Sequence, residues 1–232
     1  MNDVALALGV LAVVWAAVAT TAKVVVPRRL NRRVRESLRA FSIASELRFP
    51  LQKGESDRIV FLVGEVGRRL QLPAQDIARL QMAVRLRGIG LCAVPYRLLN
   101  GRDPAAWTAA ERAVFRRHTE VSGAMLELLP PLRHLADPVR ESAWPTPWPQ
   151  PLASASHHRA ETAGTVSGDE LGRRVLEICS QWVVWERFAG RLGAERVLAM
   201  GSGQPSTCAV FDALGAVLRS SRAQEPEAGR PA

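Results

Sequence analysis

The chain has 232 residues and carries 31 Lys and Arg against 22 Asp and Glu, a formal net charge of +9. Hydrophobic residues make up 47%, which excludes an intrinsically disordered chain. Three widely spaced cysteines, Cys92, Cys179 and Cys208, exclude a disulfide scaffold, and their apolar flanks predict buried, reduced thiols. A single tyrosine and many Ala, Leu and Arg residues favour helices over strands. A charge of +9 is typical of nucleic-acid binders, so the position of that charge along the chain matters.

The first 26 residues contain one long apolar segment. The run from Val4 to Val26 holds a single charged residue, Lys23, close to its end. About 20 apolar residues suffice for a helix to cross the roughly 30 Å hydrocarbon core, so this run predicts a transmembrane helix that contacts lipid through residues 4–26. A cleaved secretory signal would begin with a basic segment, and a buried core helix is rarely so long and so free of charge.

Basic residues follow this span directly, at Arg28, Arg29, Arg32, Arg33 and Arg35. Cations that flank a span remain on the cytoplasmic side. We therefore expect a single-pass protein of the inner (cytoplasmic) membrane with its soluble domain in the cytoplasm. Residues 1–35 account for five of the nine surplus charges, so most of the charge reports topology and can attract anionic lipid headgroups. We expect no nucleic-acid partner, because such a binder would need the remaining charges to be clustered.

The rest of the chain is predicted to be helical. We expect a basic juxtamembrane segment up to residue 35, a connecting helix over 36–49, a helical domain over 50–219 and a disordered tail over 220–232. Within the domain, Ser56 is placed to cap the first helix, and Thr108 with Glu111 forms a capping box. Apolar periodicity, caps and breakers predict helices over 56–70, 74–86, 108–117, 122–129, 131–142, 167–188 and 205–219.

A proline-rich segment interrupts this series. Proline occupies every second position from 145 to 151, which excludes a helix and favours an extended polyproline conformation. Such a strip can dock into an aromatic groove of a partner protein, and a stiff linker explains it equally well. The candidate docking residues are Trp144, Pro145, Pro147, Trp148 and Pro149.

Residues 87–100 read RGIGLCAVPYRLLN, a helix end, a glycine-containing turn and a short second helix. This segment resembles the centre of the HD-GYP domain, whose hallmark runs approximately as LLHDIGKIGIPDxILN. The family is helical and belongs to the HD superfamily of metal-dependent phosphohydrolases. The positions that match are Leu86, Ile89, Gly90, Val94, Pro95, Leu98, Leu99 and Asn100.

Further matches follow in the order that the family has them, so the resemblance covers roughly residues 50–215. They lie at ESDRIV (55–60), TAAE (108–111), HTEVSGAML (118–126), LPPLRHLADPVR (129–140) and LGRRVLEIC (171–179). The resemblance implies an all-α, HD-domain-like helical bundle, here preceded by a single transmembrane helix. The Pro/Trp-rich loop over 144–167 stands in place of the family's GYP loop.

The resemblance also implies hydrolysis of cyclic di-GMP by a metal cluster held by histidines and carboxylates. In this chain His118 is what remains of that ligand set. The substituted positions are Glu55, Arg87, Gly88, Ser142, Ala143 and Ser180. Arg87 brings a permanent positive charge to a cation site, and Gly88 supplies no ligand atom. We therefore expect no metal, no other cofactor and no catalytic residue.

The leading hypothesis is a pseudoenzyme: a membrane-tethered, catalytically inactive HD-GYP-like domain that binds and regulates partners in signalling, with a link to cyclic di-GMP pathways. We expect protein partners, and no specific small molecule is supported. The alternative is a metal-dependent phosphohydrolase with a site rebuilt from His118, Glu55, His157 and His158. Against it, His118 is expected to be a polar residue on a helix beside Arg116 and Arg117, and the other two histidines to be surface residues of a loop.

Overall fold

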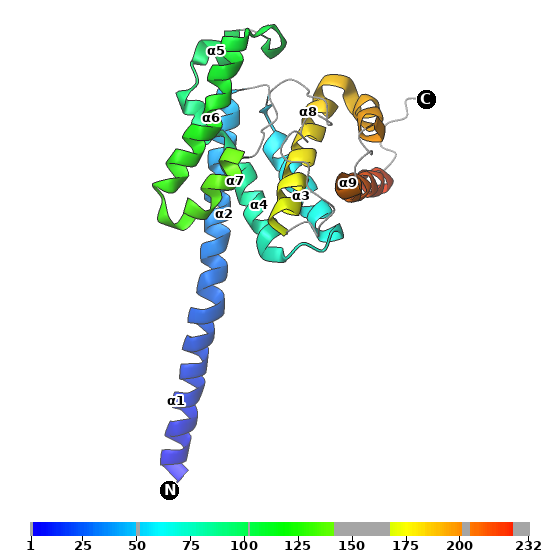
Figure 1. Cartoon of the computed structure of the whole chain (residues 1–232). Helices are drawn as coiled ribbons and strands as arrows, with labels where there is room; N and C mark the ends of the chain where they lie inside the picture. The colour runs from blue at the N-terminus through cyan, green and yellow to red at the C-terminus, as the bar shows by residue number, and fades with distance from the viewer. Residues whose placement is uncertain (1, 50–51, 102, 142–167, 201–204, 225–232) are drawn as a thin grey trace, which may run out of the picture. The chain divides into compact units, whose positions relative to one another are not determined.

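The computed structural model describes residues 2–49, 52–101, 103–141, 168–200 and 205–224. All regular elements among these residues are helical and no strand occurs, which confirms the predicted all-α class (Figure 1). The chain divides into two compact units, residues 1–40 and 41–232. The boundary lies five residues beyond the expected end of the anchor segment.

The first unit is a continuous helical segment. It contains α1 (Asn2–Thr20), a π-helical turn η1 (Thr21–Val25) and the first part of α2 (Val26–Arg48). The most apolar 18-residue window of the helix has a mean hydropathy of 2.0 and no buried residue, so its length and composition suit a membrane span. The Thr20 and Thr21 hydroxyls donate to the Ala16 and Ala17 carbonyls at 2.7 and 2.8 Å, which satisfies these polar groups within the helix.

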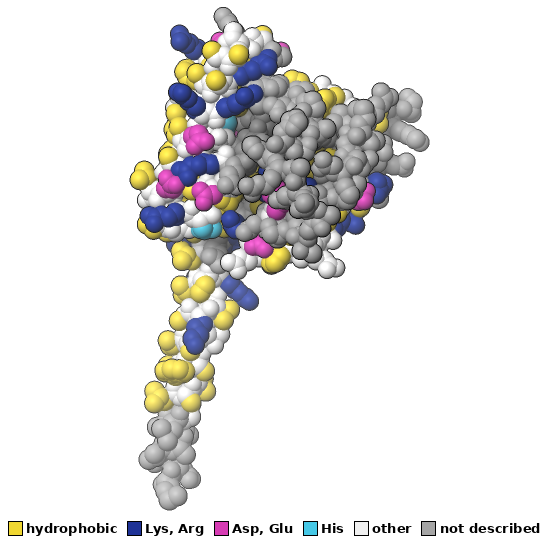
Figure 2. All heavy atoms as spheres, in the orientation of Figure 1, with side chains coloured by type: hydrophobic (Ala, Val, Ile, Leu, Met, Phe, Trp, Pro, Cys, Tyr) yellow, Lys and Arg dark blue, Asp and Glu magenta, His cyan; other side chains and the backbone are white. Residues whose placement is uncertain are grey.

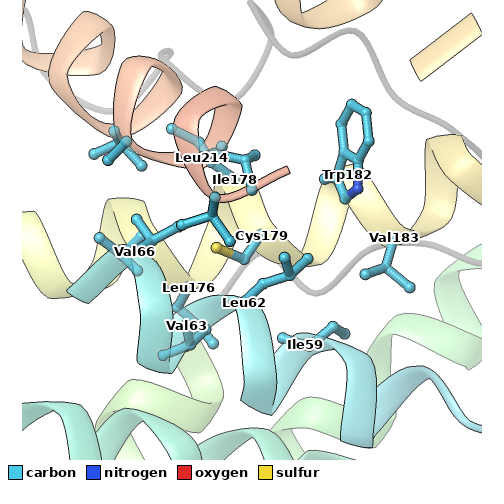
Figure 3. Close-up of a cluster of buried hydrophobic side chains, with 14 of the residues drawn as sticks. Ile59, Leu62, Val63, Val66, Leu176, Ile178, Cys179, Trp182, Val183 and Leu214 are labelled. Atoms are coloured by element: carbon cyan, nitrogen blue, oxygen red, sulfur yellow. The ribbon is translucent and has the colours of Figure 1, made fainter. Parts of the chain in front are cut away.

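The second unit has its larger core between α3 (Glu55–Arg69), α4 (Ala74–Leu86), α8 (Gly168–Met200) and α9 (Pro205–Gln224). Helix α4 has the predicted bounds. Apolar residues recur every three or four positions on α3 and α8, and they interlock between the two helices (Figure 3). The labelled contacts come from Ile59, Leu62, Val63 and Val66 of α3, Leu176, Ile178, Cys179, Trp182 and Val183 of α8, and Leu214 of α9.

A smaller core lies between the end of α2 and the elements that follow α4. The elements that enclose it are η3 (Arg87–Ala93), α5 (Tyr96–Gly101) and α6 (Ala109–Glu127). The short η4 (Pro104–Ala106) precedes α6, and η5 (Pro130–Leu135) and α7 (Ala136–Glu141) follow it. Its side chains are Phe49, Leu91, Val94, Leu98, Leu99, Trp107 and Phe115. Arg48 fixes α2 to this region, because its guanidinium donates to the carbonyls of Leu91 and Val94 at 2.9 Å.

The backbones of η3 and α6 lie in direct contact at Gly90. The Gly90 amide donates to Ser122 Oγ at 2.9 Å, and Ser122 Oγ donates to the Arg87 carbonyl at 2.7 Å. A Cβ atom at position 90 would lie 2.0 Å from the His118 carbonyl oxygen. Glycine is therefore required here by close approach, and this contact sets His118 beside Arg87.

Several predicted boundaries differ in the structure. The capping box of α6 is confirmed, but α6 continues to Glu127, so residues 122–129 form no separate helix. The predicted helix 131–142 is η5 followed by α7. Helix α8 is interrupted at Gly190 (φ 66°), two residues after its expected end, and α9 continues to Gln224, past the expected start of the tail.

Two further expectations were wrong. Ser56 does not cap α3. The N-cap residue is Gly54 (φ 80°), which has no side chain that could accept a hydrogen bond. A neighbouring helix supplies the acceptor instead, as described below. Cys92 is exposed rather than buried, whereas Cys179 is a buried free thiol as expected. Cys208 and the capping box at residue 167 lie outside the side chains that the structure describes.

We predict that Gly90→Ala lowers the free energy of unfolding by about 1–3 kcal/mol or more, because the added methyl group has no room against α6. Gly101→Ala is the matched control, since a Cβ there meets nothing within 4 Å. Urea unfolding of the full chain in detergent measures both. Equal stability of the two variants would contradict the close contact of η3 with α6.

Candidate functional site

The candidate site begins with Glu46, which caps a helix other than its own. Its two carboxylate oxygens accept from the Gly54 and Ser56 amides at 2.8 and 2.9 Å. The first amides of a helix have no partner within the helix, and the helix dipole favours negative charge at that end. Glu46 on α2 therefore does what Ser56 was expected to do, and it ties α2 to the start of α3.

The next residue inward is Glu55, in the first turn of α3. One of its oxygens accepts from Arg187 of α8, and the other lies 3.5 Å from Nη2 of Arg87. Both Glu55 and Arg87 are 5% exposed, whereas Arg187 is half-buried. The structure thus joins three elements that are far apart in sequence, α3, η3 and α8, through one carboxylate.

The charges of this site balance one another. Glu46 and Glu55 supply two negative charges, and Arg87 and Arg187 supply two positive ones. Burial raises the pKa of Glu55, and attraction to Arg87 and Arg187 opposes that rise. Burial also lowers the pKa of Arg87, and Glu55 and Glu46 oppose that change. Because an unpaired charge in this position would be very costly, each of the two buried groups depends on the other.

His118 lies on α6 at the edge of this cluster. It lies on a helix as expected, and its side chain is buried, which the sequence did not indicate. Nδ1 lies 2.5 Å from the Phe115 carbonyl, and the two rings pack with centroids 4.6 Å apart. A carbonyl oxygen only accepts, so Nδ1 carries a proton and Nε2 holds the lone pair. Burial, with a smaller contribution from Arg87, lowers the pKa of His118 to about 4, so the ring is neutral at pH 7.

Two other substituted positions are also built into the packing. A Cβ at Gly88 would lie 2.9 Å from Cβ of Ser45, so any side chain at 88 would push against α2. Ser180 of α8 is buried, and its hydroxyl has no hydrogen-bond partner among the described residues. Glycine offers no ligand atom, and a neutral serine hydroxyl is a poor metal ligand beside a carboxylate.

These donors do not fit a pair of catalytic metal ions. Glu55 is engaged by two guanidinium groups, Arg87 is itself a cation, and His118 offers one neutral nitrogen. Within the described residues, no group of three or more His, Cys, Asp and Glu side chains is placed to hold a metal. The remaining substituted positions, Ser142 and Ala143, the candidate docking residues 144–149 and both loop histidines, His157 and His158, lie outside the described residues. The expectation of no metal therefore stays a prediction.

Sequence reasoning missed Glu46 and Arg187. Glu46 lies on one face of α2 with Ser42 and Phe49, and all three are buried. A glutamate and a serine at helical spacing normally indicate a solvent-exposed face, so nothing in the pattern marked Glu46 as a buried cap. Arg187 lies in α8 next to Glu186. The local sequence gives no sign that Arg187 reaches Glu55 on a different helix.

An open hollow of about 520 Å³ lies apart from this cluster, between α5 and the start of α6. Its lining residues are Pro95, Arg97, Leu98, Gly101, Ala110, Glu111 and Val114. One arginine and one glutamate face the hollow, so it has no concentration of charge that would bind a phosphate.

Comparison with known proteins places the site within a recognised domain. Residues 40–144 match a family model described as HD domain. No curated protein matches the chain. The matched segment contains Glu46, Glu55, Arg87 and His118, so four residues of the cluster lie in the part of the chain that resembles the HD superfamily.

We predict a pH dependence of stability that is specific to His118. The unfolded chain protonates this ring below pH 6.5, but the folded chain does so only near pH 4. Between these values the unfolded state binds more protons, so stability falls as pH falls, by about 3 kcal/mol in total. Urea unfolding of the full chain between pH 7 and 4 should show this loss, and His118→Gln should remove it. His134→Gln, at an exposed position, is the control; a loss that is the same in all three proteins would contradict the buried, neutral ring.

Proposed function

We propose that this protein is a membrane-tethered, catalytically inactive HD-GYP-like domain that acts as a binding and regulatory module in signalling. The HD domain match associates residues 40–144 with a superfamily of metal-dependent phosphohydrolases. The proposal departs from that association because of one observation, the buried ion pair of Glu55 and Arg87.

The position of this ion pair carries the argument. By the resemblance to HD-GYP domains, residues 55 and 87 both correspond to metal-binding histidines. In this chain residue 55 is a glutamate and residue 87 an arginine, and their charged groups lie 3.5 Å apart. The guanidinium of Arg87 thus provides the positive charge that a metal ion would otherwise provide. This charge is part of the chain and does not depend on binding an ion. A second cation beside it would be repelled in a region withdrawn from water.

The tether and the protein partners form the second part of the proposal. The apolar window of the N-terminal helix supports a single span, and the arginines after it support a cytoplasmic domain at the inner membrane. We further propose that the segment Trp144–Pro149 docks on a protein partner. A link to cyclic di-GMP signalling would then run through that partner, since the cluster of buried charges holds no free phosphate-binding group.

The competing function is a metal-dependent phosphohydrolase with a rebuilt site. The observation that favours it is the neutral ring of His118, whose Nε2 lone pair suits a metal. It would need His157 and His158 as further ligands, with Glu55 released from its two arginines. Release of Glu55 would leave Arg87 buried without its carboxylate, which argues against this function.

We predict that the purified full chain binds less than one Mn²⁺ or Fe²⁺ ion per molecule and does not hydrolyse cyclic di-GMP or a generic phosphodiester. Elemental analysis after metal loading and a product assay measure the two properties. Two bound metal ions per chain, with turnover that disappears in His118→Ala and persists in His134→Ala, would contradict the proposal and establish the phosphohydrolase.

A further inference from the structure

In the last turns of α2, polar side chains are buried together with Leu38, while large apolar side chains on the opposite side are exposed. Ser42 and Glu46 are 3% and 7% exposed, whereas Phe41 and Leu47 are 58% and 66% exposed. This arrangement follows from the site, because Glu46 must face inward to cap α3. The apolar side of α2 is left in contact with water, which is unfavourable unless another surface covers it.

The exposed side continues along α2 with the spacing of a coiled coil. Leu30, Val34, Ser37, Phe41 and Ala44 are separated by alternating steps of four and three residues. These are the a and d positions of a heptad repeat, with Val34 and Phe41 at a and the other three at d. All five are exposed. Figure 2 shows uncovered hydrophobic side chains along the N-terminal helical segment to which α2 belongs.

The arginines of α2 avoid this seam. Arg28 and Arg35 occupy b positions of the same heptad, Arg32 and Arg39 occupy f positions, and Arg29 occupies a c position. In a two-stranded coiled coil these positions face away from the partner helix. Arg33 lies at a g position, and the corresponding e position, Leu38, is apolar and buried within its own chain. The concentrated positive charge therefore does not oppose pairing of two identical helices.

We propose that α2 pairs with α2 of a second copy of this chain as a parallel, two-stranded coiled coil along residues 30–44. A second copy fits because a heptad seam is self-complementary, with each a or d residue meeting its counterpart. The parallel orientation rests on the proposed tether, because two helices that leave the same membrane face point the same way. An approach of the apolar stripe to the lipid surface would require α2 to turn away from the span, whereas the π-helical turn η1 joins α1 to α2 through residues with helical backbone angles.

The seam is short, which sets the conditions for pairing. Fifteen residues of helix extend about 22 Å, which is little more than two heptads. Isolated helices of this length are marginal in water. Anchoring in one membrane raises the effective concentration of the second copy and supplies the missing affinity. The dimer is therefore expected in membranes, and the test uses the tethered full chain.

Disulfide formation in membranes tests the seam position by position. In a background of Cys92→Ser, Cys179→Ala and Cys208→Ser, single cysteines replace Val34, Phe41, Arg39 and Ile43. The expected result is cross-linking at 34 and 41 at least fivefold above that at 39 and 43. Equal cross-linking at all four positions, or none at any, would overturn the proposal.

A charge on the seam gives an independent measurement. With the reporter cysteine at position 34, Phe41→Glu should reduce cross-linking severalfold, and the matched control Ile43→Glu should leave it unchanged. Ile43 is also apolar and exposed on α2, but it lies at a c position. If thiols at 41 and 43 are both protected from a water-soluble reagent without forming disulfides, the stripe contacts lipid and the proposal is wrong. Recovery of the chain in the soluble fraction after cell fractionation would instead refute the tether alone.

Discussion

Two carboxylates and one guanidinium group are withdrawn from water where α2, α3 and η3 meet α8. Glu55 and Arg87 are both buried, so water cannot replace their interaction with each other. The ion pair therefore constrains where α3 and η3 can lie. Removal of Glu55 would leave two arginines without their shared carboxylate, and removal of Arg87 would leave Glu55 paired with Arg187 alone. The helices of the domain therefore depend on this charge pair, at positions that the resemblance to HD-GYP domains assigns to metal-binding histidines.

Glu46 extends this constraint from the site to the surface. Its carboxylate is committed to the amides of Gly54 and Ser56, which fixes the rotation of α2 about its own axis. That rotation turns Phe41 and Leu47 outward. Because Glu46 and Ser42 face the interior, Phe41 and Leu47 face outward. A second copy of the same helix would cover the exposed side at the observed heptad spacing.

Local signals in the sequence predicted local structure well. Thr108 and Glu111 define the start of α6, and the bounds of α4 follow from apolar periodicity and the preceding proline. The prediction that Ser56 caps α3 was wrong because a carboxylate from another helix takes the same amides, and no local pattern reports a tertiary acceptor. The resemblance to HD-GYP domains identified positions 55 and 87, but sequence alone did not indicate that the two substitutions form one ion pair.

The burial of His118 also required the structure. Its neighbours Arg116 and Arg117 give no sign of burial, yet the ring packs on Phe115 where η3 approaches α6 closely at Gly90. This contact is between backbones, and its consequence for a neighbouring side chain cannot be read from helical periodicity. The resemblance to HD-GYP domains assigns this position to a metal ligand, and in the structure the Nδ1 of His118 is bonded to the backbone of its own helix.

The central claim is that Arg87 replaces a cation by pairing with Glu55, and a double-mutant cycle tests it most directly. Urea unfolding of the full chain would be compared for the native protein, Glu55→Gln, Arg87→Met and the double variant. Direct pairing predicts that Arg87→Met lowers the free energy of unfolding by about 3–5 kcal/mol. It also predicts that the loss in the double variant is smaller than the sum of the two single losses by more than about 1 kcal/mol. Additivity within about 0.5 kcal/mol would contradict the claim, because the two charges would then act independently.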